Sequence, residues 1–121
     1  MSKFFFDTYA LFEIVHGKES YLPYNNSVIV ITKLNLMELH YRLLDLYGKQ
    51  YANKAYNKFL PFVVDITDDM IKRANEFKLF HKKKKISYVD CIGYIVARFN
   101  GMKFLTGDKE FEHFDNVEFV K

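Results

Sequence analysis

Short apolar runs alternate with helical patterns along the chain, and this alternation limits the possible folds more than any other feature. The runs have no polar–apolar alternation, which is typical of strands buried on both faces of a sheet. Helical spacing of apolar residues fills most of the intervals between them. This order predicts an α/β fold with a central, mainly parallel sheet of about five strands. The expected strands are 3–7, 28–31, 62–66, 103–106 and 117–120.

The expected helices differ in how much of their surface is apolar. A helix from Asn35 to about Gly48 has a leucine stripe, and a helix over 50–60 has apolar residues at a spacing of four. Two further helices are expected over 8–16 and from the Thr67 cap to about His81. A helix from Ser87 to Phe99 is apolar nearly all round. In the helix that begins at Asn35 the predicted core positions are Leu36, Leu39, Leu43 and Leu46. In the helix over 50–60 they are Tyr51, Ala55 and Phe59.

Composition excludes several classes of protein. With 121 residues, 50% of them hydrophobic, the chain fits one domain, 1–121, and is not disordered. Its single cysteine excludes a disulfide framework. No apolar run reaches the ~18 residues of a membrane span, and the first residues lack the pattern of a signal peptide. We therefore expect a soluble, cytoplasmic domain whose net charge of +3 permits a polyanionic partner.

Four acidic residues are expected at one edge of the sheet. Asp7 ends the first predicted strand, Asp108 follows the fourth, and Glu38 lies one turn into the helix after the second strand. In a parallel sheet the carboxyl ends of the strands meet at one edge, where α/β proteins place their sites. Asp90 joins this group if the first turn of its helix faces the same edge.

Each acid also has a purely structural explanation. Asp7 can cap the helix that follows it, and Asp108 can serve as a turn residue. Segments 35–38 and 87–90 match capping boxes, in which the third residue after the cap reaches back to it. Asp90 is the hardest to explain in this way, because a carboxylate in such an apolar helix is costly without a partner.

Taken together, the four acids favour a metal site. Two carboxylates ~5 Å apart repel by roughly 3 kcal/mol at an effective dielectric constant near 20. Four in one pocket require protonation of some of them or a bound cation. Oxygen ligands without cysteine or histidine suit Mg²⁺ or Mn²⁺. Such ions activate water and stabilise the leaving oxygen in phosphodiester hydrolysis.

Four segments that contain these acids resemble the motifs of PIN-domain ribonucleases. They occur in that family's order and approximate spacing, and the resemblance covers essentially the whole chain. Chains of this size are most similar to the VapC-type toxins of prokaryotic toxin–antitoxin pairs. The segments are 6–11 (FDTYAL), 35–39 (NLMEL), 87–92 (SYVDCI) and 106–111 (TGDKEF).

The resemblance implies a three-layer α/β/α fold and a Mg²⁺- or Mn²⁺-dependent endoribonuclease that acts on single-stranded RNA. It also implies a homodimer and a small cognate antitoxin protein as partner. Asp7 and Asp90 correspond to the primary metal ligands, and Glu38 and Asp108 to the acids that complete the site, with Asp108 also a metal ligand. Thr106 and Thr8 correspond to hydroxyl residues that support this cluster or contact substrate.

A basic segment, Lys82, Lys83, Lys84 and Lys85, leads into the helix that contains Asp90. These side chains can contact RNA phosphates, or they can simply be a solvated helix end that is favoured by the helix dipole.

Two other functions remain open from the sequence. A phosphoacceptor receiver domain also has a parallel sheet and an acidic pocket, and Asp65 would be its acceptor. Such domains usually have adjacent acids after the first strand, whereas Asp7 stands alone. The third possibility is a PIN-like module that only binds a partner.

Overall fold

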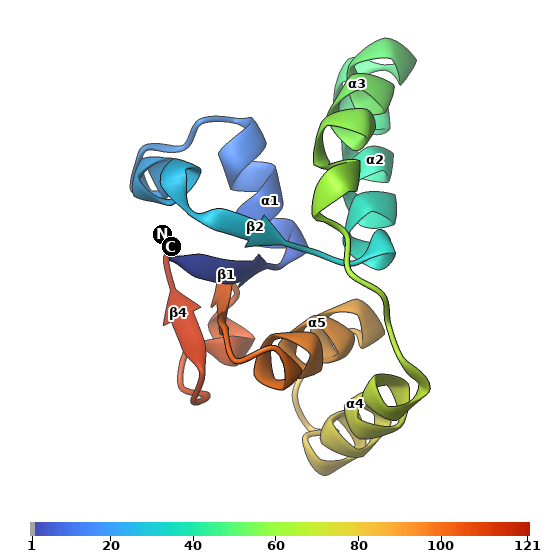
Figure 1. Cartoon of the computed structure of the whole chain (residues 1–121), viewed down its shortest axis with the longest axis vertical. Coiled ribbons are helices and arrows are strands. Elements are labelled where there is room, and N and C mark those ends of the chain that lie inside the picture. Colours follow the sequence, from blue (N-terminus) through green and yellow to red (C-terminus); the bar gives the residue numbers. More distant parts are fainter. Residues whose placement is uncertain (1) are drawn as a thin grey trace.

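A parallel sheet lies between two layers of helices in the computed structural model, which describes residues 2–121 (Figure 1). The strand order is β2-β1-β3-β4, and every neighbouring pair is parallel. This architecture confirms the predicted α/β/α fold with a parallel sheet. The strands are β1 (Lys3–Phe6), β2 (Val28–Val30), β3 (Lys103–Thr106) and β4 (Val117–Phe119).

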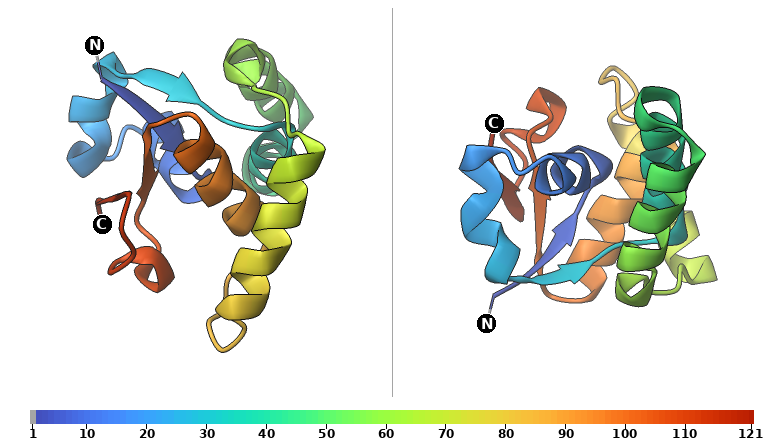
Figure 2. Two further views of the ribbon diagram at one scale, coloured as in Figure 1. Left: turned by 60° about the horizontal axis from the view of Figure 1, so that its bottom comes forward. Right: turned by 90° about the horizontal axis from the view of Figure 1, so that it is seen from above.

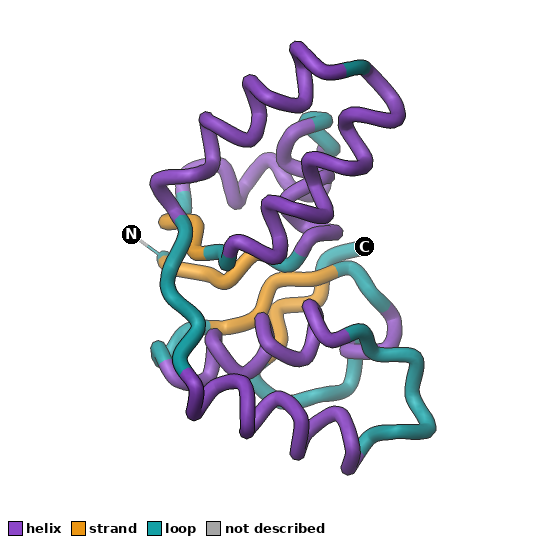
Figure 3. Tube along the Cα trace, turned by 90° about the vertical axis from the view of Figure 1, so that its right-hand side faces the viewer, coloured by secondary structure: helices purple, strands orange, loops and turns teal. Residues whose placement is uncertain are grey.

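Helices cover both faces of this sheet (Figure 3). One layer contains α1 (Thr8–Val15), α2 (Lys33–Tyr47) and α3 (Lys49–Phe59), and the other contains α4 (Asp68–Phe80) and α5 (Tyr88–Phe99). Among the described residues, no helix is both long enough and apolar enough to cross a membrane. Three short 3₁₀ helices complete the secondary structure, η1 (Glu19–Asn26), η2 (Leu60–Phe62) and η3 (Lys109–Phe111).

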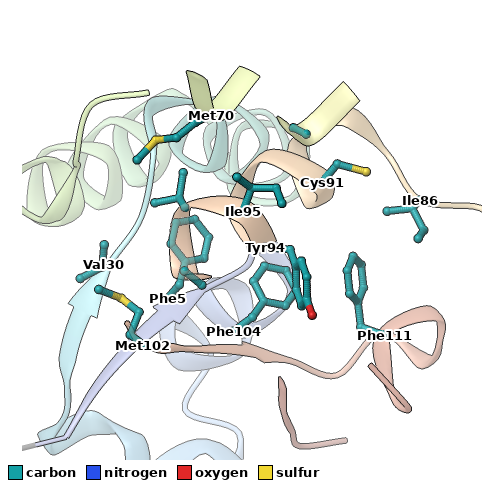
Figure 4. Close-up of a cluster of buried hydrophobic side chains, with 13 residues drawn as sticks. Phe5, Val30, Met70, Ile86, Cys91, Tyr94, Ile95, Met102, Phe104 and Phe111 are labelled. Atoms are coloured by element: carbon teal, nitrogen blue, oxygen red, sulfur yellow. The ribbon is translucent and has the colours of Figure 1, made fainter. Parts of the chain in front are cut away.

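Successive residues of the central strands face opposite layers, which explains why these strands are apolar at consecutive positions. In β1, Phe5 packs against the α4–α5 layer, and Phe6 packs against the layer of α1, α2 and α3. In β3, Phe104 and Leu105 divide in the same way. Figure 4 shows Phe5 and Phe104 side by side, with ring centroids 5.8 Å apart.

The predicted strand over 62–66 is wrong, and the sheet has four strands instead of about five. Residues 60–62 form η2, and only an isolated parallel bridge joins Ile31 to Val63. This segment passes from α3 in one layer to α4 in the other, so it crosses the edge of the sheet beside β2 (Figure 1). A chain that crosses a sheet edge has no partner strand along its length, although its residues are apolar.

Two predicted core positions are also wrong. The side chain of Leu46 is 53% exposed and that of Tyr51 is 43% exposed. Both lie where α2 turns into α3, a helix pair that extends beyond the sheet (Figure 1). The periodicity of α3 places Ala52 in the core in place of Tyr51.

The topology brings the carboxyl ends of the strands to one edge. The chain leaves β1 toward β2 on one side and returns to β3 on the other side of β1 (Figure 2). The edge between β1 and β3 is therefore the switch point at which α/β folds place their ligands. Helix α5 ends close to the start of β3, so its N-terminus lies at this same edge.

Gly93 of α5 allows this helix to lie close to the sheet. A Cβ atom at this position would be 2.7 Å from Cε1 of Phe5 and 3.1 Å from Cε1 of Phe104. Alanine normally stabilises a helix by about 1 kcal/mol over glycine. Both rings are buried and tightly packed, so the strain, which is about 1–3 kcal/mol for overpacked cores, should exceed that gain.

We therefore expect Gly93→Ala to lower the melting temperature, as measured by circular dichroism. Adding Phe5→Leu should recover part of the loss, because the smaller side chain makes room for the methyl group, so the double variant should be more stable than additivity predicts. A melting temperature that rises in Gly93→Ala would show that the helix is not held by this contact.

Candidate active site

A cavity of about 860 Å³ lies at the carboxyl edge of the sheet. All four acids singled out in the sequence line this cavity, so the structure brings together the residues that topology predicted to converge. The acids are Asp7, Glu38, Asp90 and Asp108, and the other lining residues are Thr8, Tyr9, Met37, Tyr41, Arg42, Ser87, Gly107, Lys109 and Lys121.

Asp7 is the most buried acid of the site, with 2% of its surface exposed. Its Oδ1 accepts a hydrogen bond of 2.8 Å from the backbone N–H of Ala10, so Asp7 also caps α1. Its Oδ2 accepts a hydrogen bond from the hydroxyl of Thr106. The pKa of Asp7 is raised to about 8, chiefly by burial, while the hydrogen bonds from Thr106 and Ala10 oppose the shift and the charges of Asp90 and Asp108 add to it.

Thr106, the last residue of β3, orients two of the acids. Its hydroxyl donates to Asp7 and accepts a hydrogen bond of 3.0 Å from the backbone N–H of Asp108. The side chain of Asp108 in turn accepts from the backbone N–H of Glu110, 3.0 Å away, and caps η3. The carboxyl ends of β1 and β3 are thus joined through one buried hydroxyl group.

A second network orients Glu38. The hydroxyl of Thr8 donates to Glu38 Oε1 over 2.5 Å and accepts from Nδ2 of Asn35 over 3.3 Å. Oδ1 of Asn35 accepts from the N–H and the hydroxyl of Thr32, each at 2.9 Å. The predicted capping box over 35–38 is therefore wrong. Thr32 is the N-cap of α2, and Asn35 is buried in the first turn.

Asp90 lies in the first turn of α5. The side chain of Ser87 caps this helix by accepting from the backbone N–H of Asp90, 3.1 Å away. The pKa of the Asp90 carboxyl is raised to about 6, chiefly by burial; hydrogen bonding to Ser87 opposes the shift, and the charges of Asp108 and Glu38 add to it. The capping segment predicted over 87–90 is thus present, and its acid also lines the cavity.

Sequence analysis missed the cationic and aromatic residues of the cavity. Arg42 lies one helical turn after Glu38, and that spacing of four was the available signal. Lys109 follows Asp108 directly, whereas Lys121 follows β4, whose place in the sheet is needed to locate it. Tyr41 has no sequence signal, because an aromatic residue on an amphipathic helix is more often a core residue.

The basic segment 82–85 does not line this cavity. Its lysines are exposed, the ammonium group of Lys84 lies 5.2 Å from the ring centroid of Phe114, and the backbone N–H of Lys85 donates to Glu110. Asp65, the acceptor that a receiver domain would need, is also exposed and outside the cavity. A receiver-like site is not supported by this geometry.

The donor atoms of the cavity fit a hard divalent cation. They are carboxylate oxygens, with no thiolate or imidazole beside them, and burial together with their mutual repulsion raises the pKa of two of them. Within residues 2–121, no three acidic, histidine or cysteine side chains lie close enough together to hold a metal ion as they stand. The donor chemistry therefore fits Mg²⁺ or Mn²⁺, although the side chains do not form a closed ligand set.

These features define an α/β protein with a carboxylate-lined cavity at its topological switch point. Comparison with protein families agrees: the model of the PIN domain matches residues 4–117. The chain belongs to the PIN-domain family. A search of curated protein sequences finds no significant match.

Solved structures of toxins have the same fold. VapC20 of Mycobacterium tuberculosis, a sarcin–ricin loop cleaving toxin, aligns with a TM-score of 0.76 and 22% identity over 98% of this chain and 99% of that chain. VapBC2 from Rickettsia felis, bound to a promoter DNA fragment, aligns with a TM-score of 0.73 and 19% identity over 98% of this chain and 99% of that chain. A toxin–antitoxin complex from Klebsiella pneumoniae aligns with a TM-score of 0.73 and 19% identity over 94% of each chain. At these identities the likeness establishes the fold.

The raised pKa of Asp7 makes the stability of the metal-free protein depend on pH. In the folded protein this carboxyl keeps its proton up to a pH of about 8, whereas in the unfolded chain it loses it near its model value of 3.8. Between these values the folded state binds more protons than the unfolded state. The contribution of Asp7 to the free energy of unfolding is therefore largest below pH 4 and is lost as the pH rises toward 8.

We expect the stability of the wild type relative to Asp7→Asn to fall as the pH rises from 4 to 8 and to level off above 8. Urea unfolding in EDTA at several pH values measures this difference. Asp65→Asn, which changes an exposed acid outside the cavity, is the matched control and should show no such trend. A wild-type advantage that stays constant with pH would contradict the burial of an ionisable Asp7.

Proposed function

We propose that this PIN-domain protein is a Mg²⁺- or Mn²⁺-dependent endoribonuclease that cleaves single-stranded RNA as a VapC-type toxin. The observation that carries the proposal is the composition of one cavity, in which four carboxylates meet three cationic side chains. Carboxylates alone would repel a phosphate group, and cations alone would only bind it. A site for phosphodiester hydrolysis needs both, because the acids hold the metal and the cations hold the strand.

The acids divide into ligands and supporting groups. Asp7, Asp90 and Asp108 would hold the divalent cation, since they follow β1, open α5 and follow β3 at the same edge. Glu38, oriented by Thr8, would complete the site and accept a proton from the attacking water. Thr106 keeps the Asp7 carboxylate in one orientation. A bound cation would supply positive charge that lowers the pKa of water and stabilises the leaving oxygen.

Arg42, Lys109 and Lys121 would position the phosphates that flank the cleaved bond. The Arg42 guanidinium lies 3.8 Å from the ring centroid of Phe12, which limits its movement. Lys82, Lys83, Lys84 and Lys85 lie outside the cavity and would contact phosphates only farther along the strand.

A small antitoxin would be the protein partner, and a second copy of the chain would form a homodimer. The structural neighbours support the first, because two of them are toxin–antitoxin assemblies. Large exposed apolar side chains on α4 and α5 support the second, since such patches mark protein interfaces. They include Leu79, Phe80 and Tyr88, exposed by 70%, 83% and 61%. A cytoplasmic location follows from an RNA substrate.

The chemistry is tested by replacing the proposed ligands. Asp7→Asn and Asp90→Asn should each lower the rate of RNA cleavage by orders of magnitude and leave the protein folded, because asparagine keeps the shape of the side chain and removes the charge. EDTA should abolish cleavage, and Mg²⁺ or Mn²⁺ should restore it. Asp65→Asn is the matched control and should cleave at the wild-type rate. A purified protein that binds RNA without cutting it would support a non-catalytic PIN-like module.

The product ends identify the nucleophile. Attack by water leaves a 5′-phosphate and a 3′-hydroxyl, and it still occurs when the nucleotide at the cleavage position is 2′-deoxy. Mass spectrometry of the fragments distinguishes these ends from a 2′,3′-cyclic phosphate, which would require attack by the ribose hydroxyl. Cyclic ends, or full activity in EDTA, would rule out the proposed mechanism.

The proposed contacts with RNA phosphates are tested by the salt dependence of RNA binding. Lys109→Gln and Lys121→Gln should each reduce the log–log slope of RNA affinity against salt by about 0.7, the value for one lost phosphate contact on a single strand. Lys54→Gln, on the exposed surface of α3, is the matched control and should leave the slope unchanged. Replacing all of 82–85 by glutamine measures the basic segment separately, and an unchanged slope would identify it as a solvated helix end.

A further inference from the structure

Helix α2 presents two parallel rows of side chains to the cavity. One row is apolar, Met37 and Tyr41, and the other is charged, Glu38 and Arg42. Within each row the residues are four positions apart, so they lie above one another on one helix face, one turn apart along the axis. A nucleotide has the same two kinds of surface, an anionic phosphate and a flat apolar base.

Tyr41 and Met37 are not part of the hydrophobic core. Their side chains are 71% and 58% exposed. Within residues 2–121 the side chain of Tyr41 makes no hydrogen bond and no ring–ring contact. Tyr47 of the same helix differs, because it contacts the ring of Tyr51 and is hydrogen-bonded to His16. The ring of Tyr41 is therefore exposed and unpartnered beside a charged cavity.

The charged groups beside this ring suit a nucleic-acid strand. Arg42 is the next residue along α2, and Lys109 and Lys121 line the same cavity. A phosphate held by these cations would leave the attached base close to the apolar row. Aromatic side chains that stack with bases beside such cations are typical of proteins that bind single strands, in which the faces of the bases are free.

We propose that Tyr41, with Met37 beside it, forms a stacking platform for one unpaired base of the RNA next to the phosphate that is cleaved. This inference rests on the proposed function and adds a positioning role for α2. Stacking occurs with any of the four bases, so Tyr41 would select for an unpaired nucleotide at this position without selecting its identity. A paired base, stacked on both faces within a duplex, would not fit.

The chain has no tryptophan, which makes a direct test possible. Tyr41→Trp introduces a single tryptophan whose fluorescence is quenched when a base stacks on it. The titration uses short single-stranded RNA in EDTA, and again in Mg²⁺ with Glu38→Gln added so that the strand is bound but not cut. Anisotropy of a labelled RNA is an independent measure of binding. A series of the same RNA with one abasic nucleotide, moved along the strand, locates the base that quenches.

Phe99→Trp is the matched control. Phe99 is 45% exposed at the C-terminal end of α5, nine residues or roughly 14 Å from Asp90 along the helix, and it does not line the cavity. We expect RNA to quench the fluorescence of Tyr41→Trp but not that of Phe99→Trp. One abasic position should abolish the quenching, while RNA with that position abasic still binds.

A second pair of variants measures the contribution to affinity. Tyr41→Phe should bind like the wild type, and Tyr41→Ala should bind about 5- to 150-fold more weakly, the range for loss of one base–aromatic stack. The loss should disappear for the RNA that is abasic at the quenching position. Because Tyr41 is exposed, both variants should fold, which circular dichroism verifies.

The outcomes separate the two proposals. RNA that binds without quenching Tyr41→Trp, or with equal affinity to Tyr41→Ala, overturns the stacking platform and leaves the nuclease proposal intact. Tyr41 would then be a contact for a protein partner. RNA that the wild type neither binds in EDTA nor cleaves in Mg²⁺ overturns the proposed function, and the stacking platform with it.

Discussion

The burial of the Asp7 carboxylate is the constraint on which the site depends. This side chain follows the central strand β1 and is held between the backbone of α1 and the hydroxyl of Thr106 at the end of β3. A buried charge without partners would be costly, so the two hydrogen bonds and a pKa raised to about 8 are what make this position tolerable. The same environment makes Asp7 responsive to a cation, since a positive charge would replace the proton.

The sequence predicted the layers of the fold because its strands are apolar on both faces. Phe5 and Phe6 face opposite layers, and α/β folds with helices on both faces of a parallel sheet bury both positions. The strand over 62–66 could not be excluded in the same way. Its residues are as apolar as those of a strand, but it crosses the sheet edge between α3 and α4, and apolar composition does not report the direction of the chain. The prediction that Leu46 is a core residue was wrong for a related reason, since apolar periodicity does not show where a helix extends beyond the sheet.

The acids of the site were predictable and its other residues were not. Asp7 and Asp108 lie within two residues of the carboxyl ends of β1 and β3, so the rule for parallel sheets places them together without any knowledge of side-chain packing. Lys121 needs the position of β4 in the sheet, and Tyr41 needs the exposure of one face of α2. The structural explanations for the acids were also partly right, because Asp7 caps α1 and Asp108 caps η3. A capping role and a place in the cavity are compatible, since helix N-termini and strand ends share this edge.

The buried residues of the cavity, Asp7 and Thr106, form its floor, and the exposed ones, such as Tyr41 and Lys121, form its rim. These two sets are under different physical constraints. Replacing Asp7 or Thr106 by an apolar residue would leave a polar group without its partner in the interior, so such a substitution would affect folding as well as chemistry. Tyr41 and Lys121 are exposed, and substitutions at such positions usually change stability little. The rim can therefore change without cost to the fold, and in the proposed nuclease it would determine which RNA is held while the floor determines how it is cut.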